Sequence, residues 1–334
     1  MKRRTFLTGV AGIAGALAMP HVRRAGAQSP LVLRFAHYVD VQHPGHIAAV
    51  QFADRVKERT KGAVQVNIFP NNALGSPPEE LEQCRLGAID IVVPTQGQLD
   101  KYVKAFGACE LPFVYHDYDH AHRVLDSDAM MGWLTPLAEQ ANFVILSNWE
   151  YGFRNLTTAK NPINSPDDVK GLKVRTPPEI QISASMEALG GIVTQIAYPE
   201  LYLALSQGVV DAEENPIATI YFAKFYEVQK HLALTKHIYN NMIQTMSTRS
   251  WAKLSKDQQG IVREESKSAG EKMRQLIVSQ EDDQVKKLAE IGMKVTKPDL
   301  APFKAKMQPA YDKIGTFAGA DNVKKVLEIA AKIG

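Results

Sequence analysis

An alternation of strand-like and helix-like segments, which begins at Leu31, constrains the fold of this chain more than any other feature. Residues 64–68 alternate apolar and polar side chains, as a half-buried strand does. The stretch SPPE at residues 76–79 has the pattern of a helix capping box, and Gly87 ends the helix that follows. Such an alternation predicts a mainly parallel sheet covered by helices. The predicted strands are residues 31–35, 64–68 and 89–93, and the predicted helices begin at residues 44 and 76.

The second half of the chain repeats this pattern. The stretches LGAIDIVVPT at residues 86–95 and QGVVDAEENP at residues 207–216 each end a helix at a glycine and continue through a short strand that contains an aspartate. The stretches SPDD at residues 165–168 and TPPE at residues 176–179 also resemble the helix start at residues 76–79. We therefore predict two α/β lobes of similar construction and not one large sheet.

A long helix is predicted from Leu254 to Ile291. This segment is charged, lacks proline and carries an intermittent apolar stripe. An extended piece begins at Val295, and residues 301–332 have the pattern of helices packed on a lobe. Because the lobes of such α/β chains interleave, no single linker is expected between them. The predicted lobe I comprises residues 28–152 and about 241–280, and the predicted lobe II comprises residues 153–240 and about 281–334.

The first 27 residues have the pattern of an export signal. The stretch KRRTFL at residues 2–7 is a twin-arginine signature, and a small, apolar stretch follows from Gly9 to Met19. The stretch AGA at residues 25–27 offers a cleavage site, so we expect the mature chain to begin at Gln28. An uncleaved membrane anchor is the alternative, but the apolar stretch is far shorter than the roughly 20 residues that a bilayer requires. The sequence therefore predicts a soluble protein of the periplasm.

The charge of the chain gives no reason to expect nucleic acid as a partner. The full chain has 39 Lys+Arg and 36 Asp+Glu, which is a formal net charge of +3. The predicted signal holds five of the basic residues and no acidic one. The rest of the chain therefore has 34 basic and 36 acidic residues and a net charge of −2, without the excess of basic residues that nucleic-acid binding favours.

The two cysteines, Cys84 and Cys109, can be interpreted in two ways. An oxidising compartment permits a disulfide bridge between them. However, Cys84 lies in a helical pattern and Cys109 in an apolar turn, so we expect two buried free thiols.

Arg175 stands where a predicted strand ends. Residues 172–174 alternate as on a half-buried strand, and Thr176 has the pattern of a helix cap. In open α/β sheets, ligands bind beyond the carboxyl ends of the strands, and the free amides of a helix start favour an anion. A guanidinium can hold a carboxylate through two parallel hydrogen bonds, which makes Arg175 a candidate anion ligand. A structural salt bridge with Glu179 or another acid explains the residue equally well.

A second arginine lies in an aromatic stretch, SNWEYGFRNLTT at residues 147–158. Trp149, Tyr151 and Phe153 occupy alternate positions, which places them on one face of a strand. The same geometry places Glu150 and Arg154 together on the other face. The rings are then either core residues opposite an ion pair, or one or two of them wall a ligand pocket into which Arg154 reaches. Two buried arginines without an anion would be costly, which favours a bound acid near both.

Asn215 follows a predicted strand at residues 209–212, in the stretch EENP. Its side-chain amide both donates and accepts hydrogen bonds, which suits a hydroxyl or carboxylate oxygen in a cleft. Taken alone, the residue is also an ordinary turn asparagine.

The histidines suggest a metal site at first sight. The stretch HDYDHAH at residues 116–122 is dense in possible ligands, and His43 and His46 are three residues apart. The spacing fits no zinc signature, and Asp119 is well placed to cap the helix that follows. We therefore predict no metal site.

Sequence motifs of the common enzyme classes are absent. The chain has no G-x-S-x-G, no Walker loop and no G-x-G-x-x-G after a strand. An exported two-lobed protein with an anion site and no evident nucleophile is typical of a binding protein. We therefore expect no catalytic residues and no cofactor.

The stretches that carry these features resemble a known family over nearly the whole chain after the predicted signal. The sequence is similar to the solute-binding proteins of tripartite ATP-independent periplasmic (TRAP) transporters, of the DctP type. The stretches that carry the resemblance are IFPNNALGSPPEELEQCRLGAIDIV, ELPFVYHDYDHAHRVLD, YGFRNLTT, INSPDDVKGLKVRTPP, YPELYLALSQGVVDAEENPIATIYFAKFYEVQKHLALTKH and PDLAPFKAKMQPAYDKI.

The resemblance implies an α/β fold of the two-lobed periplasmic binding protein kind (type II-like, a Venus flytrap), with a long helix spanning both lobes. It also implies that a small organic acid is held between the lobes and delivered to the membrane permease of a TRAP transporter. We expect a monomer. Sugar acids, hydroxy or keto acids and aromatic acids all remain open as ligands.

The resemblance also implies roles for individual residues. Arg175 matches the family's carboxylate-binding arginine, and Arg154 matches a second arginine contact. Asn215 matches a cleft asparagine, and Tyr198 a pocket-lining position that is often aromatic. The other residues indicated as ligand contacts are Tyr38 and Gln96, at strand ends of the first lobe, and Glu150 and Trp149, beside Arg154.

The sialic-acid-binding branch of the family is a poorer match at one place. This chain has VVPTQGQL at residues 92–99, where that branch carries charged contacts, so its ligand is not transferred. Two other classes remain as alternatives. One is a ligand-sensing periplasmic receptor component, and the other, which is remote, is a periplasmic enzyme.

Overall fold

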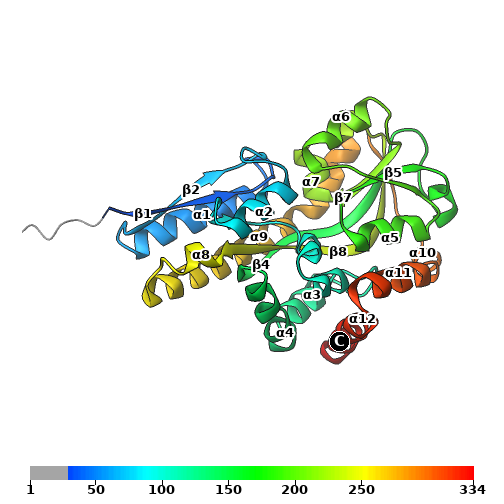
Figure 1. The fold of residues 1–334 in the computed structure, drawn as a ribbon. Helices are drawn as coiled ribbons and strands as arrows, with labels where there is room; N and C mark the ends of the chain where they lie inside the picture. Colours follow the sequence, from blue (N-terminus) through cyan, green and yellow to red (C-terminus); the bar gives the residue numbers. More distant parts are fainter. Residues whose placement is uncertain (1–28) are drawn as a thin grey trace, which may run out of the picture.

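The computed structural model describes residues 29–334, and the predicted export signal at residues 1–27 lies outside the described residues. One mixed sheet runs through the described part of the chain, in the strand order β2-β1-β3-β8-β4-β7-β5-β6, with β9 beside β8 (Figure 1). Its strands are β1 (Leu31–Ala36), β2 (Val64–Phe69), β3 (Ile91–Val92), β4 (Phe143–Thr158), β5 (Lys173–Thr176), β6 (Ile192–Gln195), β7 (Ala212–Pro216), β8 (His231–Ser247) and β9 (Lys294–Thr296).

This continuous sheet corrects the prediction that the lobes have separate sheets. Strands β4 and β8 are 16 and 17 residues long. At roughly 3.3 Å per residue, each extends about 55 Å, which is enough to cross from one half of the molecule to the other. They pair antiparallel from Phe143 opposite Ser247 to Thr158 opposite His231. Hydrogen bonds through these two strands therefore join the two halves.

The two halves are nevertheless built alike, as the repeated sequence pattern predicts. Lobe I is the half that holds the parallel strands β2, β1 and β3, with β3 antiparallel to β8. Lobe II is the half that holds the parallel strands β6, β5 and β7, with β7 antiparallel to β4. The repeated aspartates have equivalent roles. Asp90 accepts a hydrogen bond from the amide of Arg34 in β1, and Asp211 accepts one from the amide of Lys173 in β5.

Helices cover the sheet of each lobe (Figure 1). The predicted capping box at Ser76 is confirmed, because its backbone amide and hydroxyl both bond Glu79, and Gly87 ends the helix with a left-handed φ of 80°. The helices are α1 (Pro44–Arg59), α2 (Pro77–Leu86), α3 (Tyr118–Leu125), α4 (Asp128–Gln140), α5 (Ile180–Ala188), α6 (Leu201–Ser206), α7 (Ile217–Phe222), α8 (Thr248–Trp251), α9 (Lys256–Ile291), α10 (Ala301–Ala305), α11 (Gln308–Ala318) and α12 (Ala320–Ile333).

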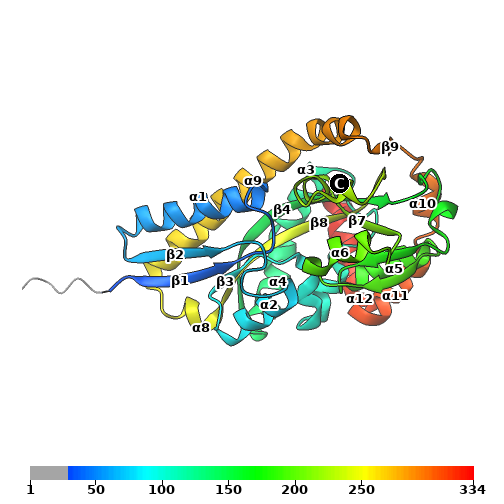
Figure 2. The same ribbon diagram turned by 90° about the horizontal axis from the view of Figure 1, so that it is seen from above.

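The predicted long helix is confirmed as α9, which has 36 residues. At 1.5 Å per residue it is about 54 Å long. It packs on α1 in lobe I and on α7 and β9 in lobe II, and Figure 2 shows it running along both lobes. Gly270 lets α9 approach β4 closely, because a side chain at this position would collide with the carbonyl oxygen of Asn148 and the ring of Trp149.

The C-terminal segment is helical, as predicted for residues 301–332. Helix α11 packs on α5 and on a 3-10 helix at Lys104–Ala108, and α12 packs on α3 and α4. The exact lobe boundaries along the chain remain a prediction.

Cys84 and Cys109 are both buried free thiols, as expected from the sequence. Within the described part of the chain, no helix combines the length and the apolar character needed to cross a bilayer.

Candidate functional site

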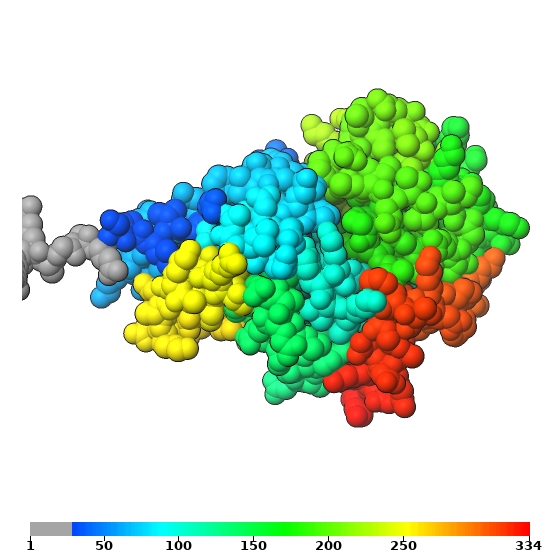
Figure 3. Space-filling view, in the orientation of Figure 1, coloured from blue at the N-terminus to red at the C-terminus, as the bar shows by residue number. Residues whose placement is uncertain are grey.

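A small cavity of about 20 Å³ lies between the two lobes. The lobes are closed over it. The hydroxyl of Thr95 in lobe I donates to Oε1 of Glu179 in lobe II at 2.8 Å, and the rings of Tyr38 and Tyr198 meet edge to face with their centroids 5.2 Å apart. In the space-filling view, the cyan segments of lobe I abut the green segments of lobe II (Figure 3). The lining residues are Tyr38, Pro77, Thr95, Gln98, Tyr151, Arg154, Arg175, Pro177, Glu179, Tyr198 and Asn215.

A wider cavity of about 470 Å³ adjoins this one and shares Tyr38 and Tyr198 with it. Its other residues also come from both lobes, such as Asp40 and Asn71 from lobe I and Phe222 and Lys224 from lobe II. The two tyrosine rings therefore stand between the small cavity and the wider one.

Arg154 is buried on β4 and already has a carboxylate partner. Its Nε and Nη2 donate to the two carboxylate oxygens of Glu214 on β7 at 2.5 and 2.8 Å, and its Nη1 donates to Oδ1 of Asn240 at 2.9 Å. Burial alone would lower the pKa of Arg154, but the charge of Glu214 raises it above its ordinary value. Burial alone would raise the pKa of Glu214, but Arg154 brings it below its ordinary value. The two side chains thus form an ion pair, and the partner is Glu214 instead of the expected neighbour Glu150.

Arg175, at the end of β5, is in a different situation. It is 1% exposed, and its Nε donates to the carbonyl oxygen of Ile196 at 2.9 Å. Within residues 29–334 no salt bridge joins Arg175 to a carboxylate, so the alternative of a structural bridge with Glu179 is not realised. Burial lowers the pKa of Arg175, but a guanidinium remains charged at neutral pH. The cavity therefore contains one buried positive charge that makes no salt bridge with a described residue, although the charges of Glu214 and Glu213 act on it from a greater distance.

Aromatic and amide side chains complete the wall beside the two arginines. The ring of Tyr38 lies 6.0 Å from that of Tyr151, edge to face, and Tyr151 in turn lies under the guanidinium of Arg154 at 5.9 Å. The hydroxyl of Tyr151 donates to Oδ1 of Asn215 at 3.4 Å, and Nδ2 of Asn215 donates to Glu213 at 2.6 Å. Of the predicted site residues, the structure brings together Arg175, Arg154, Asn215, Tyr198 and Tyr38.

A bulge in β4 changes which residues face this cavity. The register between β4 and β8 shifts between Glu150 and Gly152, and Gly152 has a φ of 114°, a left-handed conformation that favours glycine. One extra residue in a strand reverses the alternation of side chains beyond it. Tyr151 and Arg154 therefore share the cavity face, although simple alternation predicts opposite faces.

Glu150 lies on the opposite face and is separated from the cavity. Its Oε2 accepts a hydrogen bond from the hydroxyl of Tyr239 at 3.1 Å and lies 2.6 Å from Nε2 of His122. Phe153 packs on the same Tyr239, with ring centroids 5.2 Å apart. The predicted grouping of Glu150 with Arg154 on one face is therefore wrong, because the bulge lies between them.

Two further predicted site residues also lie outside the cavity. Trp149 is fully buried in the core, where its Nε1 donates to the carbonyl oxygen of Ser266 at 3.1 Å and its ring packs edge to face on Phe35. Gln96 is buried at the start of a 3-10 helix, and it is Gln98, two residues further on, that reaches the cavity.

The local structure around Arg175 and Asn215 differs from the sequence prediction. Thr176 is the last residue of β5 and not a helix cap, since α5 begins only at Ile180. The two prolines in between disfavour a helical conformation in the residues that precede them. Asn215 lies within β7, which begins at Ala212, and not beyond the end of a strand. Helix amides therefore do not explain the anion site at Arg175.

The histidines are engaged in other contacts. His43 caps α1 by accepting from the amide of Gly45 at 3.0 Å, and His37 lies 3.1 Å from His46 between ring nitrogens. Burial lowers the pKa of both His37 and His43 to about 3, which keeps them neutral. Helix α3 is capped by Asp117 and not by the expected Asp119. Within residues 29–334, no group of three or more His, Cys, Asp or Glu side chains is arranged to hold a metal ion.

Sequence reasoning did not identify several residues of the cavity as ligand contacts. They are Pro77, Thr95, Gln98, Pro177 and Glu179. The rule that ligands lie beyond strand ends could have indicated Thr95, which follows the predicted strand at residues 89–93. The two prolines stand at equivalent positions of the repeated stretches SPPE and TPPE. No pattern in the sequence indicated that Glu179 faces Thr95.

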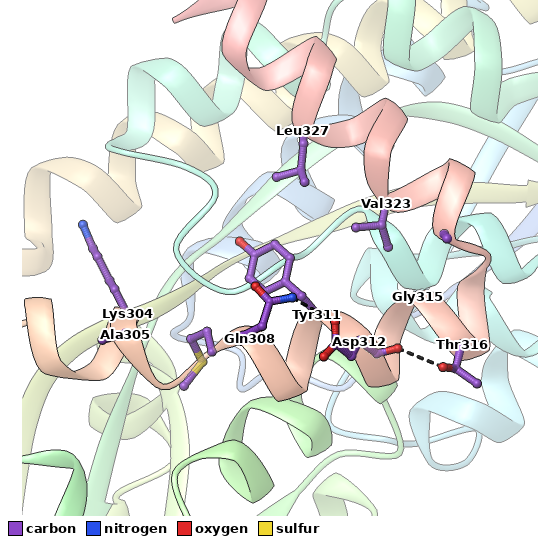
Figure 4. A pocket seen from close by; sticks show the side chains of 11 residues that line it. Lys304, Ala305, Gln308, Tyr311, Asp312, Gly315, Thr316, Val323 and Leu327 are labelled. Carbon is purple, nitrogen blue, oxygen red and sulfur yellow. Dashed lines mark hydrogen bonds between the residues drawn. The ribbon is translucent and has the colours of Figure 1, made fainter.

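A larger cavity, of about 700 Å³, lies between the C-terminal helices α10, α11 and α12 (Figure 4). Polar groups along α11 bond one another there: Gln308 donates to the carboxylate of Asp312 at 2.8 Å, and Thr316 donates to the carbonyl oxygen of Asp312 at 2.9 Å. None of the residues that line this cavity is an arginine. The interlobe cavity is thus the better candidate for an anion site.

Comparison with known proteins agrees with the fold. The model of the DctP family, described as bacterial extracellular solute-binding protein, family 7, matches residues 35–316. The sialic acid-binding periplasmic protein SiaP of Vibrio cholerae is 33% identical over 302 residues, which cover 90% of this chain and 94% of that protein.

Solved structures give the same result. A TRAP periplasmic solute-binding protein from a Polaromonas species, bound to D-erythronate, has a TM-score of 0.85 and 32% identity and covers 89% of this chain and 98% of its own. A TRAP periplasmic solute-binding protein from Sulfurospirillum deleyianum, with bound succinate, has a TM-score of 0.84 and 32% identity and covers 90% of this chain and 99% of its own.

The chain belongs to the DctP family of periplasmic TRAP transporter solute-binding proteins. Members of this family bind small organic acids and work with TRAP membrane permeases. SiaP and the two solved relatives are all named as binding proteins.

Proposed function

We propose that this protein captures one small organic acid between its lobes, with the acid's carboxylate on Arg175, and delivers it to a TRAP permease. The observation that carries the proposal is the state of Arg175: it is buried in the interlobe cavity and has no salt bridge within residues 29–334. An uncompensated buried charge is costly, and a ligand carboxylate removes that cost through two parallel hydrogen bonds.

Arg154 has a supporting role in this proposal. Its charge is neutralised by Glu214, so it offers a second carboxylate little net attraction. It nevertheless positions Asn215, because its Nη2 donates to Oδ1 of that residue at 3.2 Å. Asn215 and Tyr198 then remain as polar contacts for the rest of the ligand.

Capture requires the lobes to separate and close. The cavity of about 20 Å³ holds no more than about one water molecule, so an acid enters only when lobe I moves away from lobe II. A ligand shifts such an equilibrium only through contacts that it makes in the closed form. The closed form has those contacts from both sides, with Tyr38 and Gln98 on lobe I opposite Arg175 on lobe II.

The ligand class follows from the site and from the relatives. SiaP is named for sialic acid, and the two solved relatives hold D-erythronate and succinate, which are all carboxylates. Sialic acid itself is not transferred, because the lobe I wall of this cavity consists of Tyr38, Pro77, Thr95 and Gln98 and carries no charge. We propose a monomer that needs no cofactor and releases its ligand chemically unchanged.

A thermal-shift screen of an organic acid library tests this function. An acid present at a hundredfold excess over its Kd stabilises the protein by about 2.7 kcal/mol, which gives a clear rise in Tm. The expected result is a rise with at least one carboxylate and none with the corresponding amide or alcohol. If no acid in a broad library raises Tm, or if the bound compound is recovered chemically altered, the proposal is wrong.

A further inference from the structure

More guanidinium groups than carboxyl groups line the cavity. Two guanidinium groups, those of Arg154 and Arg175, face it together with the carboxyl of Glu179, while Glu214 is fully engaged with Arg154. Once the Arg154–Glu214 pair is set aside, the charged groups left on the cavity wall are the guanidinium of Arg175 and the carboxyl of Glu179. Arg175 can therefore hold one ligand carboxylate, and the described residues that line the cavity offer no second unpaired cation.

Glu179 is backed by a second buried carboxyl group. Glu179 is 1% exposed and Glu110 is fully buried. A side chain on Gly97 would collide with Oε2 of both residues, so the two carboxyl groups face the same point. Oε1 of Glu179 accepts from Thr95, but Oε2 is buried and accepts no hydrogen bond within the described chain.

The pKa values agree with this close approach. Burial raises the pKa of Glu110 well above its ordinary value, and the neighbouring Glu179 raises it further. Burial also raises the pKa of Glu179, although Arg154 acts in the opposite direction. An ionised ligand carboxylate beside these two carboxyl groups would raise their pKa values further, since like charges in a buried site destabilise each other.

We infer that Glu179, supported by Glu110, selects hydroxy monocarboxylates and rejects dicarboxylates. This inference rests on the proposed function, because it assumes that one carboxylate lies on Arg175. A second ligand carboxylate between the lobes would face the carboxyl of Glu179 and the uncharged lobe I wall without a second unpaired cation to neutralise it, which is costly. A hydroxyl group at the same place can instead donate to the Glu179 carboxyl, which lines the cavity and already accepts from Thr95 through Oε1.

Matched pairs of acids provide the test. D-Erythronate and meso-tartrate have the same four-carbon chain and the same two inner hydroxyls, and differ only in whether the last carbon is a hydroxymethyl or a carboxylate. Glycerate and tartronate form the corresponding three-carbon pair. Isothermal titration calorimetry with the full protein after signal removal gives Kd for each compound. The expected result is that the monocarboxylate of a pair binds at least tenfold more tightly than its dicarboxylate.

Two variants locate the cause of this preference. Glu179→Gln keeps the acceptor for Thr95 and removes the charge, so the preference is expected to shrink to threefold or less through tighter dicarboxylate binding. Glu110→Gln is expected to shrink it less, since Glu110 does not line the cavity. Glu80→Gln is the matched control: Glu80 is also a buried carboxyl with a raised pKa, but it lies outside the cavity, and its substitution leaves the preference unchanged.

The outcomes separate this inference from the proposed function. If the wild-type protein binds the dicarboxylate of a pair as tightly as the monocarboxylate, the inference is wrong while the proposed function stands. The inference also fails if Glu179→Gln binds both acids with the wild-type preference. If neither these pairs nor any other acid binds the wild-type protein, the proposed function fails and the inference falls with it.

Discussion

The two lobes share a topology but not a chemistry. Each has three parallel strands and one antiparallel crossing strand, in the orders β2-β1-β3-β8 and β6-β5-β7-β4. Lobe I faces the cavity with Tyr38, Pro77, Thr95 and Gln98, none of which is charged. From lobe II and the crossing strand β4 come Arg154, Arg175 and Glu179.

This difference in charged residues indicates that the two lobes have different roles in binding. The repeated architecture supplies two equivalent walls, and the charged groups that distinguish one ligand from another lie on only one of them. We therefore expect changes on lobe II to alter whether and which acid binds, and changes on lobe I to alter how well the closed state is held.

Arg175→Ala is expected to weaken acid binding by a factor of 1,000 or more, or about 4 kcal/mol, because the ligand carboxylate loses its partner. Without ligand, the variant is expected to be no less stable than the wild type, since an unpaired buried charge is removed. Calorimetry and thermal unfolding measure the two effects. The control is Arg55→Ala, which changes an exposed arginine of lobe I. Near wild-type affinity in a folded Arg175→Ala protein would contradict the site.

Arg154→Leu is expected to act on folding, in contrast to Arg175→Ala. It leaves Glu214 buried without its main ionic partner, which costs about 3 kcal/mol of unfolding free energy. The double variant Arg154→Leu/Glu214→Leu is expected to recover most of that loss, because no charge is then left unpaired. Chemical denaturation of both variants is the measurement. A single variant as stable as the wild type would show that the pair does not hold β4 to β7.

The buried Glu80 of lobe I is expected to make stability depend on pH without affecting binding. Burial raises its pKa from 4.5 to about 8, so the folded protein retains a proton that the unfolded chain releases. Unfolding free energy therefore falls as the pH rises from about 4.5 to about 8 and levels off above that. After allowance for solvent reaching this carboxyl, the contribution is on the order of 2 kcal/mol. In Glu80→Gln, the unfolding free energy measured by denaturation should change less between pH 5 and 8. An unchanged slope would contradict this role of Glu80.

Thr95→Val is expected to weaken acid binding about tenfold, because its hydroxyl bonds Glu179 across the gap only when the lobes are closed. Thr176→Val serves as the matched control. The hydrogen bond between the hydroxyls of Thr176 and Ser183 lies within lobe II, so lobe opening leaves it intact. Calorimetry on both variants should show a loss of affinity in the first alone. Equal losses would mean that the effect comes from general destabilisation and not from closure.

The sequence and the family resemblance together indicated several residues of the cavity. Arg175, Asn215, Tyr198 and Tyr38 were predicted as site residues and line one cavity, and the repeated aspartates correctly indicated two similar lobes. The site residues and the repeated lobes could be predicted because they depend on local sequence patterns or on the family resemblance. A single sheet was not foreseen, because nothing in the composition of the long strands β4 and β8 says that they cross both lobes.

The misplaced residues have a common physical reason. Glu150 was assigned to the face of Arg154 by simple alternation, and the bulge at Gly152 reverses that alternation. A bulge depends on pairing with a distant strand, here β8, so one strand's sequence does not reveal it. Trp149 has an aromatic ring suited to a pocket wall, but its indole is used to anchor β4 to α9.

The two long strands have a mechanical consequence. Residues 143–158 and 231–247 bridge the halves as a paired ribbon, and the ribbon's irregular positions lie between residues 145 and 156. A paired ribbon bends at bulges while most of its cross-links stay intact. We therefore expect the lobes to open by flexing this ribbon at its bulges while the two strands stay paired. The molecule consequently tends to return to one preferred geometry after each release of its cargo.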